Sequence, residues 1–364
     1  MSARSPAVPL SFFGIAVGLL AFANTWHMAA RLWHLPQEVA SALTVAGLAT
    51  WAGLLLLQAY KWMAHRAEAM AELRHPVQSA FAALATVASL LAALALLPLS
   101  HGLAMGVLGV ALAGQLALGL VLNGRLWTGG RPPELVTPST YLPGVAQSFV
   151  AATAAAAFGW HELGLLFFGV GVLAWLTLES MILQRAAVGT PLPAALRPLL
   201  GIQLAPAVVG GGAWMSLSSG LPDVVAWMLL GYGLYQALLL LRLLPWIREQ
   251  AFTPGYWAFS FGAAALPALA MRMAERGAGS LAAALAPVLF VAANGVFALL
   301  VGGTLRLLAK GALLPPVAPA AARTVTAALT GTAAPSAPSA TATTTASAAP
   351  TAPAGLCAGP AAGC

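Results

Sequence analysis

Long apolar runs separated by short polar breaks dominate this chain. Ten runs can be traced, at positions 10–33, 39–62, 76–97, 102–123, 141–159, 163–183, 198–217, 222–244, 255–273 and 281–308. One helical membrane span needs about 20 mostly apolar residues, and each run is close to that length. The sequence therefore predicts an all-α integral membrane protein with ten transmembrane helices.

Composition supports this class. Only 7% of the 364 residues are charged and the mean hydropathy is +0.87, whereas about a quarter of the residues of a soluble domain are charged. Alternation in segments of about ten residues, which is typical of outer-membrane barrels, is missing. The 37 glycines show no period of three, which excludes collagen.

The breaks between the runs predict how the helices pair. The connections at 34–38, 98–101 and 160–162 are short, so the helices that they join are antiparallel neighbours. The second connection, 63–75, is longer and charged. We expect five tandem helical hairpins.

Basic residues predict the orientation. Thirteen of the 16 Lys and Arg residues lie at one end of the predicted bundle, and Arg31, Arg272 and Arg276 lie at the other. By the positive-inside rule, both termini are predicted to be cytoplasmic, and the protein to be a multi-pass membrane protein. A cleaved secretory signal is the alternative for the first run, but the run continues through Met28 and is interpreted as a span.

The chain divides into three segments. Residues 1–9 form a short cytoplasmic N-terminus and residues 10–308 the membrane domain. Residues 309–364 are rich in Ala, Pro, Thr and Ser and hold both cysteines, Cys357 and Cys364, which predicts a disordered cytoplasmic tail. The net charge of +7 comes from single basic residues rather than a patch interleaved with aromatics, so nucleic acid is not an expected partner.

Proline is unevenly distributed among the runs. Odd-numbered runs carry it at or inside their ends, at Pro9, Pro76, Pro143, Pro198, Pro206, Pro254 and Pro267, against Pro222 and Pro287 in even runs. Proline kinks a helix, and the freed backbone groups are tolerated where they line a cavity. The odd helices could thus form an inner layer around a pore, although proline is also simply common in membrane helices.

Residues for chemistry are scarce. Glu179 is the one acid within a run, and the polar groups that could line a path are neutral, among them Gln203 and Ser260. The six histidines form no i, i+4 pair with a second ligand, so no metal or other cofactor is expected. Without a Ser-His-Asp set, a phosphate-binding glycine loop or paired carboxylates, the chain is not expected to be an enzyme.

Several segments together resemble the TehA-type tellurite-resistance and C4-dicarboxylate transporter family, which is related to the plant slow anion channels. The matching segments are SFFGIAVG at 11–18, LRHPV at 73–77, YLP at 141–143, LGIQLAPA at 200–207, GYGL at 231–234, RLLPW at 242–246 and WAFSFG at 257–262. They run in the expected order from about residue 9 to 308. The tail has no counterpart.

The resemblance implies five hairpins around a central pore, with odd helices inside and even helices outside. It also implies a homotrimer with one pore per protomer, blocked by a phenylalanine of the ninth span. Here that gate is Phe261, with Phe259 as the fallback. Position 262 is glycine where plant members tend to have proline, which points to the bacterial branch. Candidates for lining the pore or kinking its helices are Phe13, Gly14, Pro76, Pro143, Gln203, Pro206, Ser260 and Gly262.

Three functions remain to be compared. The first is a channel that conducts small anions, which a weakly binding apolar pore permits. The second is a proton-coupled transporter of C4-dicarboxylates or oxyanions such as tellurite, for which a mid-span titratable group or an inverted repeat is the expected sign, and neither is seen. The third is a scaffold or resistance protein without transport. Small anions and membrane lipid are the expected partners.

Overall fold

The computed structural model describes residues 8–314, and all regular structure within them is helical. The α-helices of this part are α1 (Phe13–Trp33), α2 (Gln37–Ala64), α3 (Arg66–Arg74), α4 (Ala82–Leu96), α5 (His101–Trp127), α6 (Gln147–Ala157), α7 (His161–Val188), α8 (Ala205–Leu217), α9 (Val224–Ile247), α10 (Ser260–Glu275) and α11 (Ser280–Ala309). The all-helical class predicted from the sequence is confirmed. The predicted tail from 315 onward lies outside the described residues.

Eight helical segments of this part are long and apolar enough to cross a membrane. The predicted fifth and ninth spans are not among them. In both runs the first turns belong to other kinds of helix, η4 (Pro138–Tyr141) and η5 (Leu142–Ala146) before α6, and η7 (Pro254–Phe259) before α10. Apolar periodicity does not distinguish these tighter or wider turns from α-helix.

The same feature recurs at the start of three further helices. η1 (Leu10–Phe12) precedes α1, η2 (Gln78–Phe81) precedes α4 and η6 (Ala194–Leu204) precedes α8. Prolines occupy these starts: Pro206 lies in the first turn of α8, Pro143 lies in the π-helix η5, and Pro254 opens η7. A first turn tolerates proline because its N–H groups have no partner within the helix. Most of these prolines thus mark where helices begin, and Pro267 is the one inside α10.

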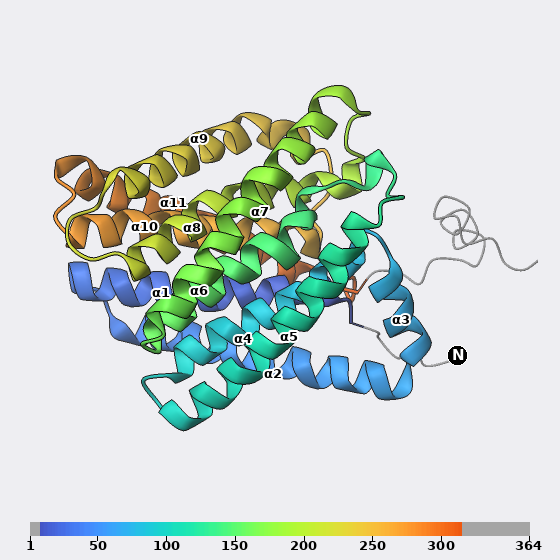
Figure 1. Ribbon diagram of the computed structural model, residues 1–364, viewed down its shortest axis with the longest axis horizontal. Coiled ribbons are helices and arrows are strands. Elements are labelled where there is room, and N and C mark those ends of the chain that lie inside the picture. Colours follow the sequence, from blue (N-terminus) through green and yellow to red (C-terminus); the bar gives the residue numbers. More distant parts are fainter. Residues whose placement is uncertain (1–7, 315–364) are drawn as a thin grey trace, which may run out of the picture. The chain divides into compact units, whose positions relative to one another are not determined.

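Contacts between helices define two groups. The inner helices α1, α4, α6, α8 and α10 pack in a closed cycle, α1 on α4, α4 on α6, α6 on α8, α8 on α10, and α10 on α1. The outer helices α2, α5, α7, α9 and α11 each pack on the inner helix that precedes them in the chain. Figure 1 shows α1 beside α10, although they lie near opposite ends of the described chain.

Burial separates the two groups. Each span was compared over an apolar stretch of 18 residues. In the spans that contain α1, α4 and α8, between 67% and 72% of this stretch is buried, against 17% to 28% in the five outer spans. The outer helices expose large apolar side chains such as Leu56, Val110, Leu166, Leu238 and Leu299. A helix that is apolar all round and exposed in a monomer is suited to lipid.

Small residues allow the inner helices to approach closely. A Cβ at Gly18 of α1 would lie 2.3 Å from Ser260 Oγ of α10, and one at Gly262 would lie 2.8 Å from Leu204 Cβ. Thr25 Oγ1 of α1 donates to Ala264 O of α10 at 2.9 Å. The close approach of α10 to α1 therefore depends on the absence of a larger side chain at Gly18, and its approach to η6 on the absence of one at Gly262.

A short polar helix that the sequence did not predict, α3, lies in the charged connection after α2. Its Glu72 pairs with Lys61 Nζ at 2.6 Å and accepts the Leu10 N–H at 2.8 Å. Lys61 Nζ and Gln58 Nε2 both donate to Val8 O, at 3.2 and 2.7 Å. The side chains of the ion pair are only 6% and 11% exposed, so this buried cluster fixes the start of α1.

Candidate functional site

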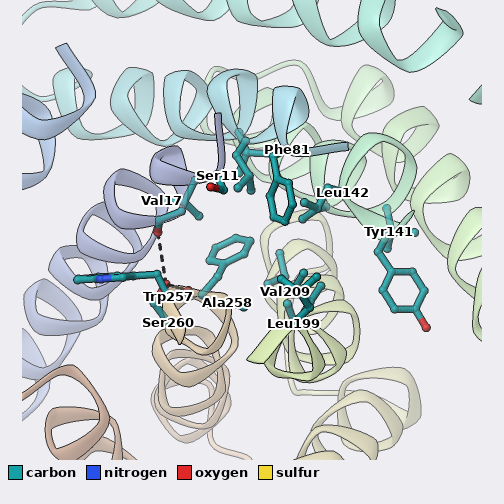
Figure 2. Close-up of a pocket in the computed structure, with 18 of the residues that line it drawn as sticks. Ser11, Val17, Phe81, Tyr141, Leu142, Leu199, Val209, Trp257, Ala258 and Ser260 are labelled. Carbon is teal, nitrogen blue, oxygen red and sulfur yellow. Dashed lines mark hydrogen bonds between the residues drawn. The ribbon is translucent and has the colours of Figure 1, made fainter. Parts of the chain in front are cut away.

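A cavity with about 70 Å³ of room for water lies among the inner helices. Its lining comes from all five, with the segments that precede them, and from none of the outer helices (Figure 2). The lining residues are Ser11, Gly14, Val17, Phe81, Leu84, Val87, Tyr141, Leu142, Val145, Ala146, Phe149, Leu199, Ile202, Ala205, Pro206, Val209, Pro254, Gly255, Trp257, Ala258, Ser260 and Phe261.

The cavity lies at the N-terminal ends of these helices. In each helix the lining residues fall in the preceding segment or in the first two turns, for example Ser11 to Val17 around the start of α1 and Leu199 to Val209 around the start of α8. The N-terminal end of a helix carries the positive end of its dipole. Five such ends converge on one space, which favours negative charge there without any basic side chain.

No lining residue is charged, and most are apolar. The polar hydrogens of three lining side chains are already bonded to other groups of the protein. Ser260 Oγ donates to Trp257 O at 2.6 Å, Trp257 Nε1 donates to Thr304 Oγ1 at 2.9 Å, and Tyr141 Oη donates to Glu179 Oε2 at 2.5 Å. The wall thus offers an anion few donors.

The sequence candidates separate into two sets. Four line the cavity: Gly14, Pro206, Ser260 and Phe261. Phe261 belongs to the first turn of α10 and is half-buried. The fallback candidate Phe259 is not among the lining residues, because its ring packs over Gly201, where a Cβ would lie 2.6 Å from it.

The other candidates lie behind or beside the lining. Phe13 is fully buried in the core, and Gly262 packs against Leu204. Pro143 lies in η5, and the carbonyl of Pro76 accepts a hydrogen bond from Arg131 Nη2 at 2.5 Å. Sequence reasoning missed the lining rings of Phe81 and Phe149, because no motif or spacing indicates which side chains of different helices meet.

Gln203 belongs to a group of polar side chains that surrounds Glu179. Neither Gln203 nor Glu179 lines the cavity. Trp175 Nε1 donates to Glu179 Oε2 at 2.9 Å, and the hydroxyl of Tyr232 donates to Oε1 at 2.8 Å. Gln203 hydrogen-bonds the Tyr141 hydroxyl. These contacts join η4, η6, α7 and α9, and neither ion pair of the described residues includes Glu179.

A second polar contact lies between α4 and α6. Gln147 Nε2 donates to Thr86 Oγ1 at 2.5 Å, and Thr86 donates in turn to Ala83 O at 2.8 Å. Within the described residues, the buried side-chain atoms that lack a partner are Gln115 Oε1, Gln147 Oε1, Arg185 Nε and Nη2, and Gln203 Oε1. Groups of three or more residues suited to hold a metal ion are not found between positions 8 and 314.

His75 and Arg131 connect the starts of two inner helices. His75 Nδ1 accepts the N–H groups of Val77 and Gln78, both at 3.1 Å, just before η2. Arg131 bonds Pro76 O before α4 and Thr140 Oγ1 before α6. Burial and the Arg131 charge lower the pKa of His75 below its usual 6.5, against a smaller opposing effect of Glu72. The neutral ring can accept both N–H bonds.

Comparison with known proteins identifies the family of this chain. The family model described as a voltage-dependent anion channel, SLAC1, matches residues 7–305. The chain is 35% identical over 305 residues to the tellurite resistance protein TehA homolog of Haemophilus influenzae, covering 84% of this chain and 92% of that protein.

Plant proteins match as well. The S-type anion channel SLAH1 of Arabidopsis thaliana is 31% identical over 129 residues, which is 35% of this chain and 33% of the plant protein. Its relative SLAH2 is 23% identical over 286 residues, or 74% and 53% of the two chains. The match of the family model over most of the described residues, together with the long TehA alignment, shows that this chain belongs to the SLAC1 family of voltage-dependent anion channels.

Proposed function

We propose that this protein is a bacterial TehA-like channel in which small anions pass through the cavity between the inner helices. In this proposal ten helices cross the membrane as five hairpins, and the inner helices form the pore wall. The observation that carries the proposal is the uncharged cavity that all five inner helices line with their N-terminal ends.

Weak binding is the basis of conduction here. Dipoles at five helix starts attract an anion, but no side-chain cation holds it, so the anion also leaves easily. A wall with few free donors replaces little of the hydration shell. Weakly hydrated anions should therefore pass more readily than strongly hydrated ones, and a strong preference for chloride over nitrate would contradict the proposal.

Phe261 is the proposed gate. Its ring is the aromatic group that α10 itself contributes to the lining, where a phenyl group narrows the path and repels water. Phe261→Ala should raise the single-channel conductance in planar bilayers at least several-fold. Phe259→Ala is the matched control, because the same ring two residues earlier packs on Gly201 outside the lining.

The decisive experiment measures currents of wild type and Phe261→Ala in anion gradients, with and without a proton gradient. A reversal potential that follows the anion and ignores pH supports the channel. If neither form conducts while uptake of labelled dicarboxylate follows the proton gradient, the protein is a coupled transporter and the proposal fails. Absence of all flux would indicate the scaffold function.

The assembly and its location complete the proposal. We place both termini in the cytoplasm, the protein in the bacterial inner membrane, and three protomers in each assembly, with one pore each. The exposed apolar outer helices provide surface for contacts with lipid and with other protomers. Native mass spectrometry tests the trimer, and labelling of single cysteines placed in the connections tests the orientation.

A further inference from the structure

Tyr141 contributes the single phenol of the cavity wall, and its hydroxyl is turned away from the space. Figure 2 shows the ring beside Leu142 with the oxygen directed away from the other labelled side chains. Tyr141 is fully buried, and its hydroxyl donates to Glu179 Oε2 at 2.5 Å. A donor that could meet an anion in the cavity is thus bound to a carboxylate behind the wall.

Glu179 is held firmly in this position. Its two oxygens accept three hydrogen bonds, from Tyr141 before α6, from Trp175 one turn earlier in α7, and from Tyr232 in α9. Gln236 Nε2 donates to the Tyr232 hydroxyl at 2.8 Å and directs the proton of that hydroxyl toward Glu179. Hydrogen bonds to a carboxylate are about twice as strong as neutral ones, so the Tyr141 hydroxyl does not readily leave it.

We propose that Glu179 is a selectivity-determining residue that acts through Tyr141, by keeping the phenol hydroxyl of the pore wall away from the permeating anion. The inference rests on the proposed channel function. With the hydroxyl bound to Glu179, a strongly hydrated anion such as chloride finds no phenol to replace its lost water. The carboxylate charge, one hydrogen bond behind the wall, also repels anions of every kind.

The two effects can be separated by substitution. In Glu179→Gln the amide oxygen can still accept the Tyr141 proton but carries no charge, so conductance should rise while the ratio of nitrate to chloride permeability changes little. In Glu179→Ala the hydroxyl loses its acceptor, so the Tyr141 side chain can turn toward the cavity and donate to an anion. The nitrate-to-chloride ratio should then fall about two- to tenfold, the effect of one net hydrogen bond.

A double-mutant cycle tests the role of Tyr141. Permeability ratios come from reversal potentials in nitrate and chloride gradients, in a Phe261→Ala background that opens the pore. Glu179→Ala should lower the ratio when Tyr141 is present and leave it unchanged when Tyr141→Phe is added. Glu162→Gln is the matched control, because Glu162 is an exposed acid at the opposite end of α7.

Each outcome decides between alternatives. If Glu179→Ala lowers the ratio equally in the Tyr141→Phe background, the effect does not pass through the phenol and the inference is wrong. It is also wrong if Glu179→Gln leaves conductance unchanged, a result that remains available should Glu179→Ala fail to fold. Absence of current in every background would instead refute the channel function itself.

Discussion

The inner and outer helices of this protein are built from similar apolar residues but differ in nearly every other respect. The inner helices are mostly buried, begin with 3-10 or π turns, and approach one another at glycines. The outer helices are continuous α-helices of 24 to 30 residues that expose leucine and valine. Hydrophobicity therefore places both groups in the membrane, while packing and local helix geometry determine which group forms the cavity.

The largest loss of stability is expected at the ion pair between α2 and α3 that holds the start of the inner helix α1. Glu72→Gln leaves Lys61 buried without its carboxylate, and breaking a buried pair in this way costs about 3–5 kcal/mol. Thermal unfolding in detergent measures the loss. Glu249→Gln is the control, because Glu249 pairs with Arg197 but is 62% exposed, and such pairs contribute about 1 kcal/mol or less. Equal losses would show that the Lys61 cluster does not fix α1.

Leucine truncation tests the comparison directly. Leu90 of α4 is fully buried and Leu166 of α7 is 69% exposed. Leu90→Ala should lower the free energy of unfolding by about 2–5 kcal/mol, whereas Leu166→Ala should change it little, because lipid or detergent can fill the space. Chemical unfolding of both variants in the same detergent measures the difference. A larger loss for Leu166 would mean that the outer surface is packed against protein.

Adding one methyl group should lower the stability of the protein in an inner helix and raise it in an outer helix. Gly18→Ala places a Cβ 2.3 Å from Ser260 Oγ, and overpacking of this kind costs about 1–3 kcal/mol. Gly106→Ala in α5 meets open space and should stabilise by up to about 1 kcal/mol, because alanine favours helix. Melting temperatures of the two variants provide the test, and a shift of the same sign in both would contradict close packing at α1 and α10.

The smallest effect is expected for the pH dependence of stability that comes from His75, before the start of α4. The pKa of His75 is lower in the folded protein than in the unfolded chain, so the unfolded chain binds the proton first as pH falls. The stabilising contribution is complete above pH 6.5 and is lost as pH falls through the folded pKa. His75→Asn, whose amide oxygen can accept the same N–H groups at any pH, should flatten the dependence of melting temperature on pH below 6.5. An unchanged dependence would assign it to other groups.

Much of the fold could be predicted because each long helix has a local sequence signal, an apolar run that ends at polar residues. The 3-10 and π starts could not, since residues such as Leu142 and Ile202 are apolar in either geometry. Helix α3 was missed because its nine residues, RAEAMAELR, are too short a run and too rich in charge to indicate a span. Lys61 is one of the thirteen basic residues counted for the predicted orientation, and the structure buries it against Glu72.

The site was predicted where motifs are local and missed where it depends on contacts between helices. Phe261 and Ser260 lie in one conspicuous motif, and both line the cavity. Phe81, which directly precedes α4, lines the same cavity because α4 and α10 both pack on α1. No spacing in the sequence indicates these contacts between helices. The sequence drew attention to Glu179 as the one acid within a run, but its bonds to Tyr141 and Tyr232 come from segments 38 and 53 residues away.

The contact between α1 and α10 also sets a condition on biosynthesis. The hydrogen bond from Thr25 cannot form until Ala264, 239 residues later in the chain, has been synthesised. At about 5–20 residues per second, this delay is roughly 10 to 50 s of translation. Until then the first helix resides in the membrane with one flank open to lipid or to the insertion machinery. A ribosome-bound chain that stops before α10 therefore lacks the part of the cavity wall that Ser260 and Phe261 supply.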